Sequence, residues 1–389
     1  MRVARGDAVA LTRELVRIDS RNPALVPGGP GEAAVAHALA EVLREWGFRV
    51  ELMDAAPGRP NVVARIGAGD GRSLMFNGHL DVVGTEGMVH EPWLADVHDG
   101  RMYGRGSADM KSGVAAMCAA AARAAAEVTG EIIVAAVVDE EFESAGTRTL
   151  VERGVRADAA IVTEPTSLAI MPSHLGFVWL DVTTHGRAAH GSRWQIGVDA
   201  IRHAGLLLAE LDRFDAGELS ARAHALLGRP SLHASLIEGG SGMSTYPDRC
   251  TVRLERRTIP GESADQVRRE IEDACARVAR AKRDFHATVN VTFAQPPSDV
   301  ATDAPIVRAL SHTLSACGET PRVEGMSAWT DAALLNAAGI PAICFGPGTI
   351  GVAHAAEEWV PIDEIERATA VLARLACEWT AGREDAWRS

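Results

Sequence analysis

The sequence predicts an α/β protein whose mainly parallel sheet has helices on both faces and carries an inserted, ferredoxin-like βαββαβ domain. Two observations lead to this prediction. Short apolar runs of strand length alternate with segments that have apolar residues at helical spacing, which is typical of a parallel sheet with crossover helices. Near Gly176 the pattern changes to strands in which apolar and polar residues alternate, as expected for strands with one exposed face.

The larger domain is expected to occupy both ends of the chain. Its expected helices cover 8–18, 32–46, 108–126, 304–317 and 363–380, and a further helix begins at 147–151. Its expected strands cover 48–53, 61–66, 74–77, 131–139, 159–162 and 342–345. At 389 residues the chain is too long for one ordinary core, so two domains are the natural expectation.

The smaller domain is expected at 176–294. A strand at 177–186 is followed by a helix at 198–214, strands at 231–238 and 249–259, a helix at 263–281 and a strand at 287–293. This order is the βαββαβ arrangement of a ferredoxin-like module. The segment Gln295-Pro296-Pro297-Ser298 is interpreted as the returning linker, so residues 1–175 and 295–389 form one discontinuous domain.

Composition and charge argue against several classes of protein. The chain has 47% apolar and 23% charged residues and a formal net charge of −13, which is typical of a globular protein and argues against a nucleic-acid partner or an anionic membrane surface. Its six cysteines are scattered without a Cys-x-x-Cys pair, as expected for a reducing compartment. The first twenty residues lack an uninterrupted apolar segment, and the alanine-rich run at 114–126 is too short to span a bilayer. We therefore expect a cytoplasmic protein without a membrane partner.

The first candidate site lies at residues 73–81, SLMFNGHLD, where a buried strand leads into His79 and Asp81. Residues two apart in an extended chain point the same way, so both side chains can face one pocket. In an open α/β sheet, ligands bind at the carboxyl ends of the strands. A histidine can bind a metal through one ring nitrogen while a nearby carboxylate orients its ring.

Further acids and a second histidine follow predicted strands or lie in glycine-rich loops. Asp109 lies in GRGSADMKSG, where it could instead cap the following helix. Glu140 and Glu141 end the strand of VVDEEFESAG, and Glu164 ends the strand of AAIVTEP. His354 lies in the loop GPGTIGVAHAAEEW. Three consecutive acids, at 139 to 141, would repel one another at the end of a buried strand unless cations compensate them.

Together these residues form a mixed nitrogen and oxygen ligand set. Two histidines, one potentially shared aspartate and two glutamates suit a pair of zinc ions, and a spare carboxylate beside a water between the ions could act as general base. Adjacent residues in an extended segment point in different directions, so Glu140 and Glu141 could divide these tasks. The spacing alone does not assign the individual roles.

Two rival chemistries find little support in the sequence. The glycines at 346–351 match GxGxxG after a strand, but a dinucleotide-binding turn should open a helix, and this loop instead runs to His354 and Trp359-Val360-Pro361. A serine hydrolase of the α/β type would need a Gly-x-Ser-x-Gly turn, and the sequence contains none.

Five motifs in order give the chain a specific resemblance to a known family. HLDVV, GRGSADMKSG, DEEFESAG, TEPT and the late loop histidine resemble segments of the co-catalytic zinc deacylases and carboxypeptidases. That family includes acetylornithine deacetylase, succinyl-diaminopimelate desuccinylase and glutamate carboxypeptidase. The resemblance covers nearly the whole chain, from LVRIDSRNP near its start to the loop histidine. It implies a zinc-peptidase-like catalytic domain with an inserted domain that acts as lid and dimerisation surface.

The resemblance also implies a ligand set for two metal ions. His79 and Glu164 would bind one ion, Glu141 and His354 would bind the other, and Asp109 would bridge them. Zinc is the expected metal, with cobalt or manganese as alternatives.

Asp81 matches the family residue that orients the first histidine, and Glu140 matches the general base that deprotonates the bridging water.

In the inserted domain, the resemblance implies residues that bind the substrate. THGRAAHGS resembles the GxxAHxS segment of the family, in which His190 would steady the oxyanion, often in the partner subunit of a homodimer. Arg257 in RRTIPGE matches the arginine that grips a substrate carboxylate. The chain departs from the family pattern at Ser244, where an asparagine is common and would donate one hydrogen bond to the substrate or to the oxyanion. It also departs at Trp329, where a glycine is commoner and where the ring could narrow the acyl pocket or pack in the core.

The expected function is hydrolysis of the amide bond of an N-acyl amino acid. Glu164, where aminoacylase-like members often carry aspartate, favours a small-acyl deacylase of the acetylornithine deacetylase or desuccinylase type. A dipeptidase or a glutamate-type carboxypeptidase of the same family is the alternative. A metal-dependent binding or scaffold protein is the non-enzyme alternative, but such a relative would normally lack a ligand or the base, and all seven family positions are filled here.

Overall fold

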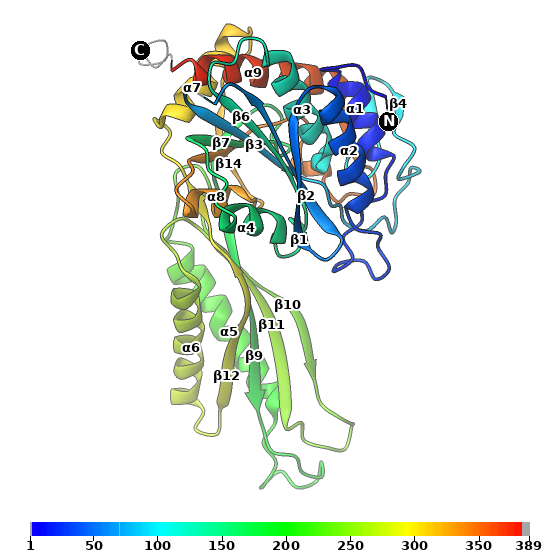
Figure 1. The fold of residues 1–389 in the computed structure, drawn as a ribbon. Coiled ribbons are helices and arrows are strands. Elements are labelled where there is room, and N and C mark those ends of the chain that lie inside the picture. Colours follow the sequence, from blue (N-terminus) through cyan, green and yellow to red (C-terminus); the bar gives the residue numbers. More distant parts are fainter. Residues whose placement is uncertain (1, 70, 383–389) are drawn as a thin grey trace. The chain divides into compact units, whose positions relative to one another are not determined.

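The structure is a computed structural model that describes residues 2–69 and 71–382. It contains two compact units (Figure 1). The first comprises the residues up to Pro172, Val300–Glu324 and the residues from Thr330 on, and the second comprises Ser173–Asp299 and Gly325–Trp329. The borders expected from the sequence lie at 175/176 and 294/295, with the short segment 325–329 in the larger domain. The short segment belongs to the second unit because the Leu175 N–H donates to the Met326 carbonyl at 3.2 Å, and Trp329 Nε1 donates to the Pro296 carbonyl at 2.9 Å.

The first unit is built around a sheet whose strands lie in the order β1-β2-β6-β3-β7-β15-β8. The four central strands, β6, β3, β7 and β15, are parallel to one another, and β2, β1 and β8 are added at the two sides in antiparallel fashion. The bounds are β1 Arg49–Ala56, β2 Arg59–Gly67, β3 Ser73–His79, β6 Glu131–Val137, β7 Ala159–Val162, β8 Ile170–His174 and β15 Ala342–Cys344; the short β14, Val323–Met326, also pairs with β8.

Helices cover both faces of this sheet (Figure 1). On one side, α3 and α9 pack on β3, with α1 against both, α7 against α9, and α2 on β1 and β2. On the other side, α4 contacts β1 and α8 contacts β7 and β15. The bounds are α1 Ala8–Val16, α2 Ala33–Glu45, α3 Ser112–Ala124, α4 Ala145–Glu152, α7 Pro305–Ala316, α8 Ala332–Ala337 and α9 Ile362–Thr380. The predicted fold class, α/β with a mainly parallel sheet, is confirmed.

Small residues let α3 approach the sheet closely. The alanines of this helix are almost all fully buried against α1, α9 and β3. A Cβ atom at Gly113 would lie 1.9 Å from the carbonyl oxygen of Thr163, so only glycine fits at this contact. Thr163 follows β7 directly and precedes Glu164. The close contact therefore fixes α3 against the end of β7, where two of the candidate site segments meet.

The predicted helix at 108–126 is wrong at its start, since α3 begins only at Ser112. Asp109 has φ −118° and ψ 96°, which is extended backbone. The N–H groups of Ala108 and Asp109 donate to the carboxylate of Glu358 at 3.0 and 3.1 Å, so they are not used for a helical turn. The segment just before it contains β4 (Asp96–His98) and β5 (Arg101–Tyr103), which form a small sheet with β16 (Trp359–Pro361).

The second unit has an antiparallel sheet in the order β10-β11-β9-β12. Both helices, α5 and α6, pack on one face of it, and the apolar side of each strand turns toward them. The bounds are β9 Gly176–His185, α5 Ala200–Phe214, β10 Ser231–Gly239, β11 Arg249–Thr258, α6 Ala264–Ala281 and β12 His286–Gln295; the short β13, Ser298–Asp299, pairs with the last residues of β8. The chain therefore follows the βαββαβ order expected of a ferredoxin-like module.

His174 should make the protein less stable in acid. It is 2% exposed, Nδ1 donates to the Leu175 carbonyl at 3.0 Å, and burial lowers its pKa to about 4. Because the unfolded chain then binds the proton more tightly, stability falls as pH drops from about 6.5 to about 4, by up to about 3 kcal/mol. Denaturant unfolding of His174→Gln should show a flatter pH dependence in this window. The exposed His286→Gln is the control, and equal slopes for both variants would refute the prediction.

Two further properties concern the chain's environment. In the part of the chain that the structure describes, no helix is both long and apolar enough to cross a bilayer. Cys118, Cys250, Cys275 and Cys344 are free thiols and are buried. Burial raises the pKa of the Cys118 thiol, which makes this side chain a poor nucleophile.

Candidate metal centre

The candidate site forms where the parallel strands of the first unit end. β3 ends at His79, β6 leads into Glu140 and Glu141, β7 leads into Glu164, and the chain after β15 reaches the loop of His354. Because β6, β3, β7 and β15 run parallel, their carboxyl ends lie at one edge of the sheet. The topology thus gathers residues that are up to 275 positions apart in the sequence (79 to 354).

Asp109 lies between the two imidazoles of this edge. His79 Nε2 is 3.0 Å from Asp109 Oδ1, and His354 Nε2 is 3.4 Å from Asp109 Oδ2. Each oxygen of one carboxylate therefore faces a different histidine, an arrangement suited to a carboxylate shared by two metal ions. The alternative that Asp109 caps α3 is wrong, since no side chain caps this helix.

Three glutamates surround the two histidines. Glu141 Oε2 is 3.0 Å from His354 Nε2, and Glu140 Oε2 is 3.9 Å from His79 Nε2. Glu164 is 3% exposed, and its charge interacts with those of Asp109, His79 and Glu141. The structure thus brings six of the candidate residues into one cluster, in which the His79 side chain is buried and that of His354 is half exposed.

These side chains titrate far from their usual ranges because they are buried together. Burial raises the pKa of Glu140 and that of Glu164 well above the usual range, and neighbouring carboxylates add to the effect. Burial opposes the charging of both histidines, but hydrogen bonds to Asp109 outweigh it, so the pKa of His79 is raised well above its usual value and that of His354 to about 10. Burial also opposes ionisation of Asp109, and the hydrogen bonds of both imidazoles still hold its pKa below the usual range.

This donor set fits a pair of divalent cations. His79, Asp109 and Glu141 each offer one ligand atom, and these atoms all lie within 4.8 Å of one another. Imidazole nitrogens combined with carboxylate oxygens suit zinc, and they also bind cobalt or manganese. Four buried carboxylates face only two imidazoles, so the cluster draws protons to balance its charge. Two divalent ions would supply that positive charge directly.

Asp81 contacts the backbone beside the metal residues. His79 Nδ1 donates to the backbone carbonyl of Asp81 at 2.9 Å and lies 3.7 Å from its carboxylate. The carbonyl therefore turns Nε2 of the ring toward Asp109. The Asp81 carboxylate accepts hydrogen bonds from the backbone N–H groups of Glu140 and Glu141, both at 3.1 Å. It holds in place the segment that carries both glutamates.

Glu358 is a supporting residue that sequence reasoning did not find. Its fully buried carboxylate accepts the N–H groups of Ala108 and Asp109 and pairs with Arg105 NH1 at 2.5 Å. Because Glu358 lies four residues after His354, it ties the loop of one candidate ligand to the backbone of another, Asp109. In the sequence it is one of two adjacent glutamates before a tryptophan, a pattern that equally suits a solvated surface.

The remaining candidates lie in the second unit. His190 is exposed and pairs across an isolated bridge with Thr245, and the Gly191 N–H donates to the Ser244 carbonyl at 2.7 Å, so His190 and Ser244 are neighbours. Arg257 lies on β11 opposite Phe177, and its Nε is 2.6 Å from Glu255 Oε1.

The departure at Trp329 has a structural partner. Its ring stands edge-on to His174, with the ring centroids 6.2 Å apart, and its Nε1 donates to the Pro296 carbonyl. The sequence leaves open whether the Trp329 ring narrows the acyl pocket or packs in the core. Within the second unit, the ring makes a packing contact.

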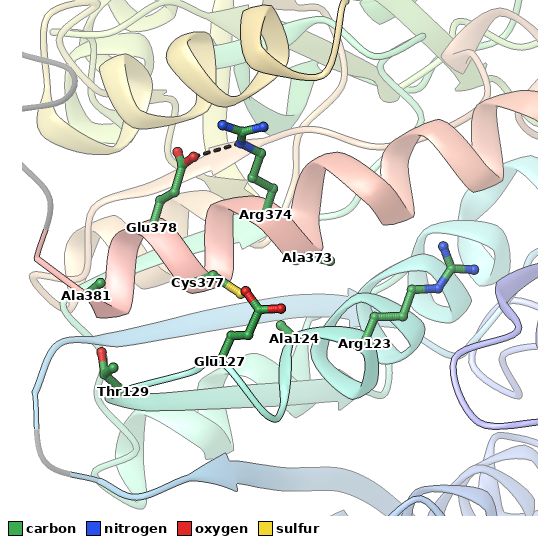
Figure 2. Close-up of a pocket in the computed structure, with 9 residues that line it drawn as sticks. All are labelled: Arg123, Ala124, Glu127, Thr129, Ala373, Arg374, Cys377, Glu378 and Ala381. Atoms are coloured by element: carbon green, nitrogen blue, oxygen red, sulfur yellow. Dashed lines mark hydrogen bonds and ion pairs between the residues drawn. The ribbon is translucent and has the colours of Figure 1, made fainter.

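A pocket of about 460 Å³ lies apart from the metal residues, between α3 and α9 (Figure 2). Arg123, Glu127, Arg374 and Glu378 line it, and Arg374 is paired with Glu378 at 2.7 Å. Arg123 is at the carboxyl end of α3, about 20 Å along a 13-residue helix from the end next to Asp109. No candidate site residue lines this pocket, so it is separate from the metal centre.

An α/β fold that gathers two histidines and several carboxylates at the carboxyl edge of parallel strands is typical of metal-dependent hydrolases. Comparison with known proteins agrees. The chain belongs to peptidase family M20/M25/M40, whose family model matches residues 75–378. It is a hydrolase of that family, and the family relationship predicted from the five motifs is confirmed.

The relatives in this family include a deacetylase, a deformylase and a peptidase. The chain is 32% identical to an acetylornithine deacetylase of Myxococcus xanthus over 350 residues, which cover 88% of this chain and 90% of the relative. It is 28% identical to an N-formyl-4-amino-5-aminomethyl-2-methylpyrimidine deformylase of Bacillus subtilis over 386 residues, 89% of each protein. Its fold is similar to that of a dinuclear metal-binding M20 peptidase of Bacillus subtilis, with a TM-score of 0.73 and 16% identity over 96% of this chain and 98% of that chain.

Proposed function

We propose that the protein is a metal-dependent deacylase that hydrolyses the amide bond of a small N-acyl amino acid, in the manner of acetylornithine deacetylase. The observation that carries this proposal is the position of Asp109, with one oxygen toward each histidine, close to Glu140, whose Oε2 lies 3.9 Å from His79 Nε2. Two relatives named as a deacetylase and a deformylase, at 32% and 28% identity, support removal of a small acyl group.

The proposed ligands are those that the family resemblance implies, and the contacts within the cluster support them. His79 and Glu164 would hold one divalent ion, Glu141 and His354 would hold the other, and Asp109 would contact both. When bound, two zinc ions would lower the pKa of a water molecule and polarise the scissile carbonyl. Zinc is the metal we propose, because this mixture of imidazole and carboxylate ligands suits it.

Glu140 would move the protons of the reaction. It accepts a proton from the water that attacks the carbonyl carbon and delivers this proton to the nitrogen as the C–N bond breaks, which releases a carboxylate and a free amine. Burial raises the pKa of Glu140, so its carboxyl group can hold the proton at near-neutral pH. Asp81 keeps this residue in position through the Glu140 N–H.

Arg257 and His190, two proposed substrate-binding residues of the second unit, are too far apart to serve one small molecule within one chain. Phe177 of β9 is paired with Arg257, and His185, eight residues further along β9, is paired with Arg249. Eight residues of strand span about 26 Å. His190 lies beyond that far end, where it is bridged to Thr245. If Arg257 binds the carboxylate of the substrate and His190 steadies the oxyanion, the two side chains must come from different subunits.

A homodimer through the second unit meets this requirement. β10 is an edge strand of the sheet, and its Leu236 and Ile237 are 58% and 57% exposed. An exposed apolar edge strand is a ready template for a second copy of the same strand. We place the subunit contact at β10, with a second copy of this chain as the partner.

Mixing two inactive variants tests whether His190 acts in the partner subunit. His190→Ala and Glu140→Gln should each have little activity alone. After subunit exchange at equal concentrations, about a quarter of wild-type activity should return, because half of the dimers are mixed and each mixed dimer has one complete site. The readout is turnover after dissociation and reassociation. No recovery, with mixed dimers detected by mass spectrometry, would place His190 in its own chain's site.

A substrate panel tests the proposed activity. The protein, reconstituted with zinc, cobalt or manganese, should hydrolyse N-acetyl amino acids, with N-formyl and N-succinyl derivatives as comparisons. Dipeptides and N-terminally blocked glutamates test the alternative, a dipeptidase or carboxypeptidase. A higher kcat/KM for dipeptides than for every acyl amino acid would overturn the deacylase assignment and favour that alternative.

The cellular compartment stays a prediction. A reducing, cytoplasmic location agrees with the free thiols of Cys118, Cys250, Cys275 and Cys344, and a small-molecule substrate needs no nucleic acid or membrane partner.

A further inference from the structure

A buried chain of polar side chains leads away from the metal centre behind Asp81. Asn22 Nδ2 donates to Asp81 Oδ2 at 2.9 Å and to Asp139 Oδ1 at 3.0 Å. Asp139 Oδ1 is also paired with Arg59 NH1 at 2.8 Å. Arg59 in turn forms a two-point pair with Glu32, at 2.5 and 2.8 Å. We name Glu32, Arg59, Asp139 and Asn22 the supporting chain.

The supporting chain is almost entirely shielded from water. Glu32 and Asn22 are fully buried, and Asp139 is 4% exposed. The supporting chain and Asp81 together contain three carboxylates and a single guanidinium, so their formal charges do not cancel. Burial raises the pKa of Glu32, while its two-point pair with Arg59 acts in the opposite direction. Such buried charges are costly and stabilise a fold little compared with apolar residues of the same size. Their presence next to the active site is better explained by the geometry that they impose.

That geometry concerns the peptide between the two glutamates of the site. The Asp81 carboxylate accepts three donors, namely the N–H of Glu140, the N–H of Glu141 and Nδ2 of Asn22. The hydrogen bonds from the two N–H groups to Asp81 fix the orientation of this peptide. The orientation of the peptide determines the direction of each side chain, with Glu140 pointing toward His79 and Glu141 toward His354.

Asp139 holds the same segment from its other side. Its φ of 68° is in the left-handed region, which is uncommon for a residue other than glycine and which local hydrogen bonds must support. Its N–H donates to Glu32 Oε1 at 3.1 Å, and its Oδ2 accepts the N–H of Ala145 at 3.3 Å. The supporting chain therefore fixes the backbone immediately before Glu140.

We propose that Asn22 is a positioning residue of the active site, which sets the Glu140–Glu141 segment by joining the carboxylates of Asp81 and Asp139. It touches neither the substrate nor a metal ion, and it acts through Asp81. This inference rests on the roles proposed above for Glu140 and Glu141. It assigns a function to the asparagine of the segment DSRNP, in which the sequence alone shows only a helix end.

The test is Asn22→Asp, which keeps the size of the side chain. Oδ1 of Asn22 accepts the Ala24 N–H at 3.0 Å, and aspartate retains this contact. Aspartate loses both donated hydrogen bonds and places a third carboxylate against Asp81 and Asp139. We expect kcat to fall about 10- to 100-fold with little change in KM, and the affinity for at least one metal ion to fall by a similar factor, the usual effect of removing support from a metal ligand. Metal affinity is measured by competition with a chromophoric chelator, independently of turnover.

Asn336→Asp is the matched control. Asn336 Nδ2 donates to the Ala342 carbonyl at 2.8 Å and Oδ1 accepts the Ala342 N–H at 2.9 Å, so this substitution also removes a donor to an oxygen and keeps an acceptor. It should lower the melting temperature without a selective loss of kcat or metal affinity. Equal kcat and metal affinity in the two variants would overturn the proposal, because Asn22 would then be merely structural.

Asn22→Ala covers the case in which Asn22→Asp does not fold. It removes the donors without adding charge, and the same loss of kcat and metal affinity is expected. Wild-type values for this variant would overturn the proposal. Failure of the proposed function is distinguishable from failure of this inference: if Glu140→Gln retains wild-type turnover, the role of Glu140 is wrong, whereas the effect of Asn22 on metal affinity would still be measured.

Discussion

Replacement of Glu140 by glutamine is expected to lower kcat by about 10²- to 10⁴-fold, the contribution of a general acid–base group. Glutamine has the size of glutamate and can keep the backbone contact of residue 140 to Asp81, but it cannot accept and return a proton. Two metal ions per chain should remain bound, because Glu140 is not among the proposed ligands. Steady-state kinetics with elemental analysis of the same sample measure both quantities.

Glu143→Gln is the control for this experiment. Glu143 lies on the same loop, three residues further along, and is exposed. It should have wild-type kcat. Near wild-type turnover in metal-loaded Glu140→Gln would contradict the proton-transfer role. Loss of metal in proportion to activity would show instead that Glu140 is a ligand.

The strands and the positions of the candidate ligands could be predicted from the sequence because each depends on local chemistry. An apolar run such as EIIVAAVV can only be a buried segment, and the acids that directly follow it must lie at the end of that segment. For β7, the predicted bounds 159–162 are those of the structure. Once the strands are assigned to one parallel sheet, the rule that their carboxyl ends share an edge places His79, Glu141 and Glu164 together.

The contacts that hold this site in place could not be predicted, since they join residues far apart in the chain. Glu358 binds the Asp109 N–H across 249 positions, and Asn22 reaches Asp139 across 117. Neither residue has a local pattern that differs from that of an ordinary loop. The same reason explains the wrong start of α3, because helical spacing continues through Ala108 while a distant carboxylate takes the N–H groups.

In the second unit, the order of the elements could be predicted, but the distances between its residues could not. Its order of elements follows from the alternation of apolar and polar residues, but that pattern does not say how the ends of a strand are separated in space. His190 and Arg257 are both plausible substrate-binding residues in the sequence, and only the register of β9 with β11 shows that they lie at opposite ends of the sheet. The proposed homodimer therefore rests on the register of β9 with β11 as well as on the family resemblance.

Asp109→Ala is expected to remove both metal ions and to lower kcat/KM by about 10³-fold or more, since bound metal supplies several kcal/mol of transition-state stabilisation. The reason is geometric. Its two oxygens lie 3.0 and 3.4 Å from the imidazoles of different histidines, so one carboxylate serves both proposed ion positions. The metal content per chain, measured by elemental analysis after dialysis, should fall from two ions toward none.

The number of metal ions that each variant loses distinguishes a carboxylate shared by two ions from a ligand of one ion. His354→Ala removes a proposed ligand of the second position only, so it should leave the His79 ion in place and reduce the content to about one per chain. If Asp109→Ala also retained one ion with unchanged affinity, Asp109 would belong to a single position. Asp96→Ala, an exposed acid on β4, should retain both ions and full activity. A bridging role therefore predicts a larger loss for Asp109 than for His354, because one side chain supports two cations.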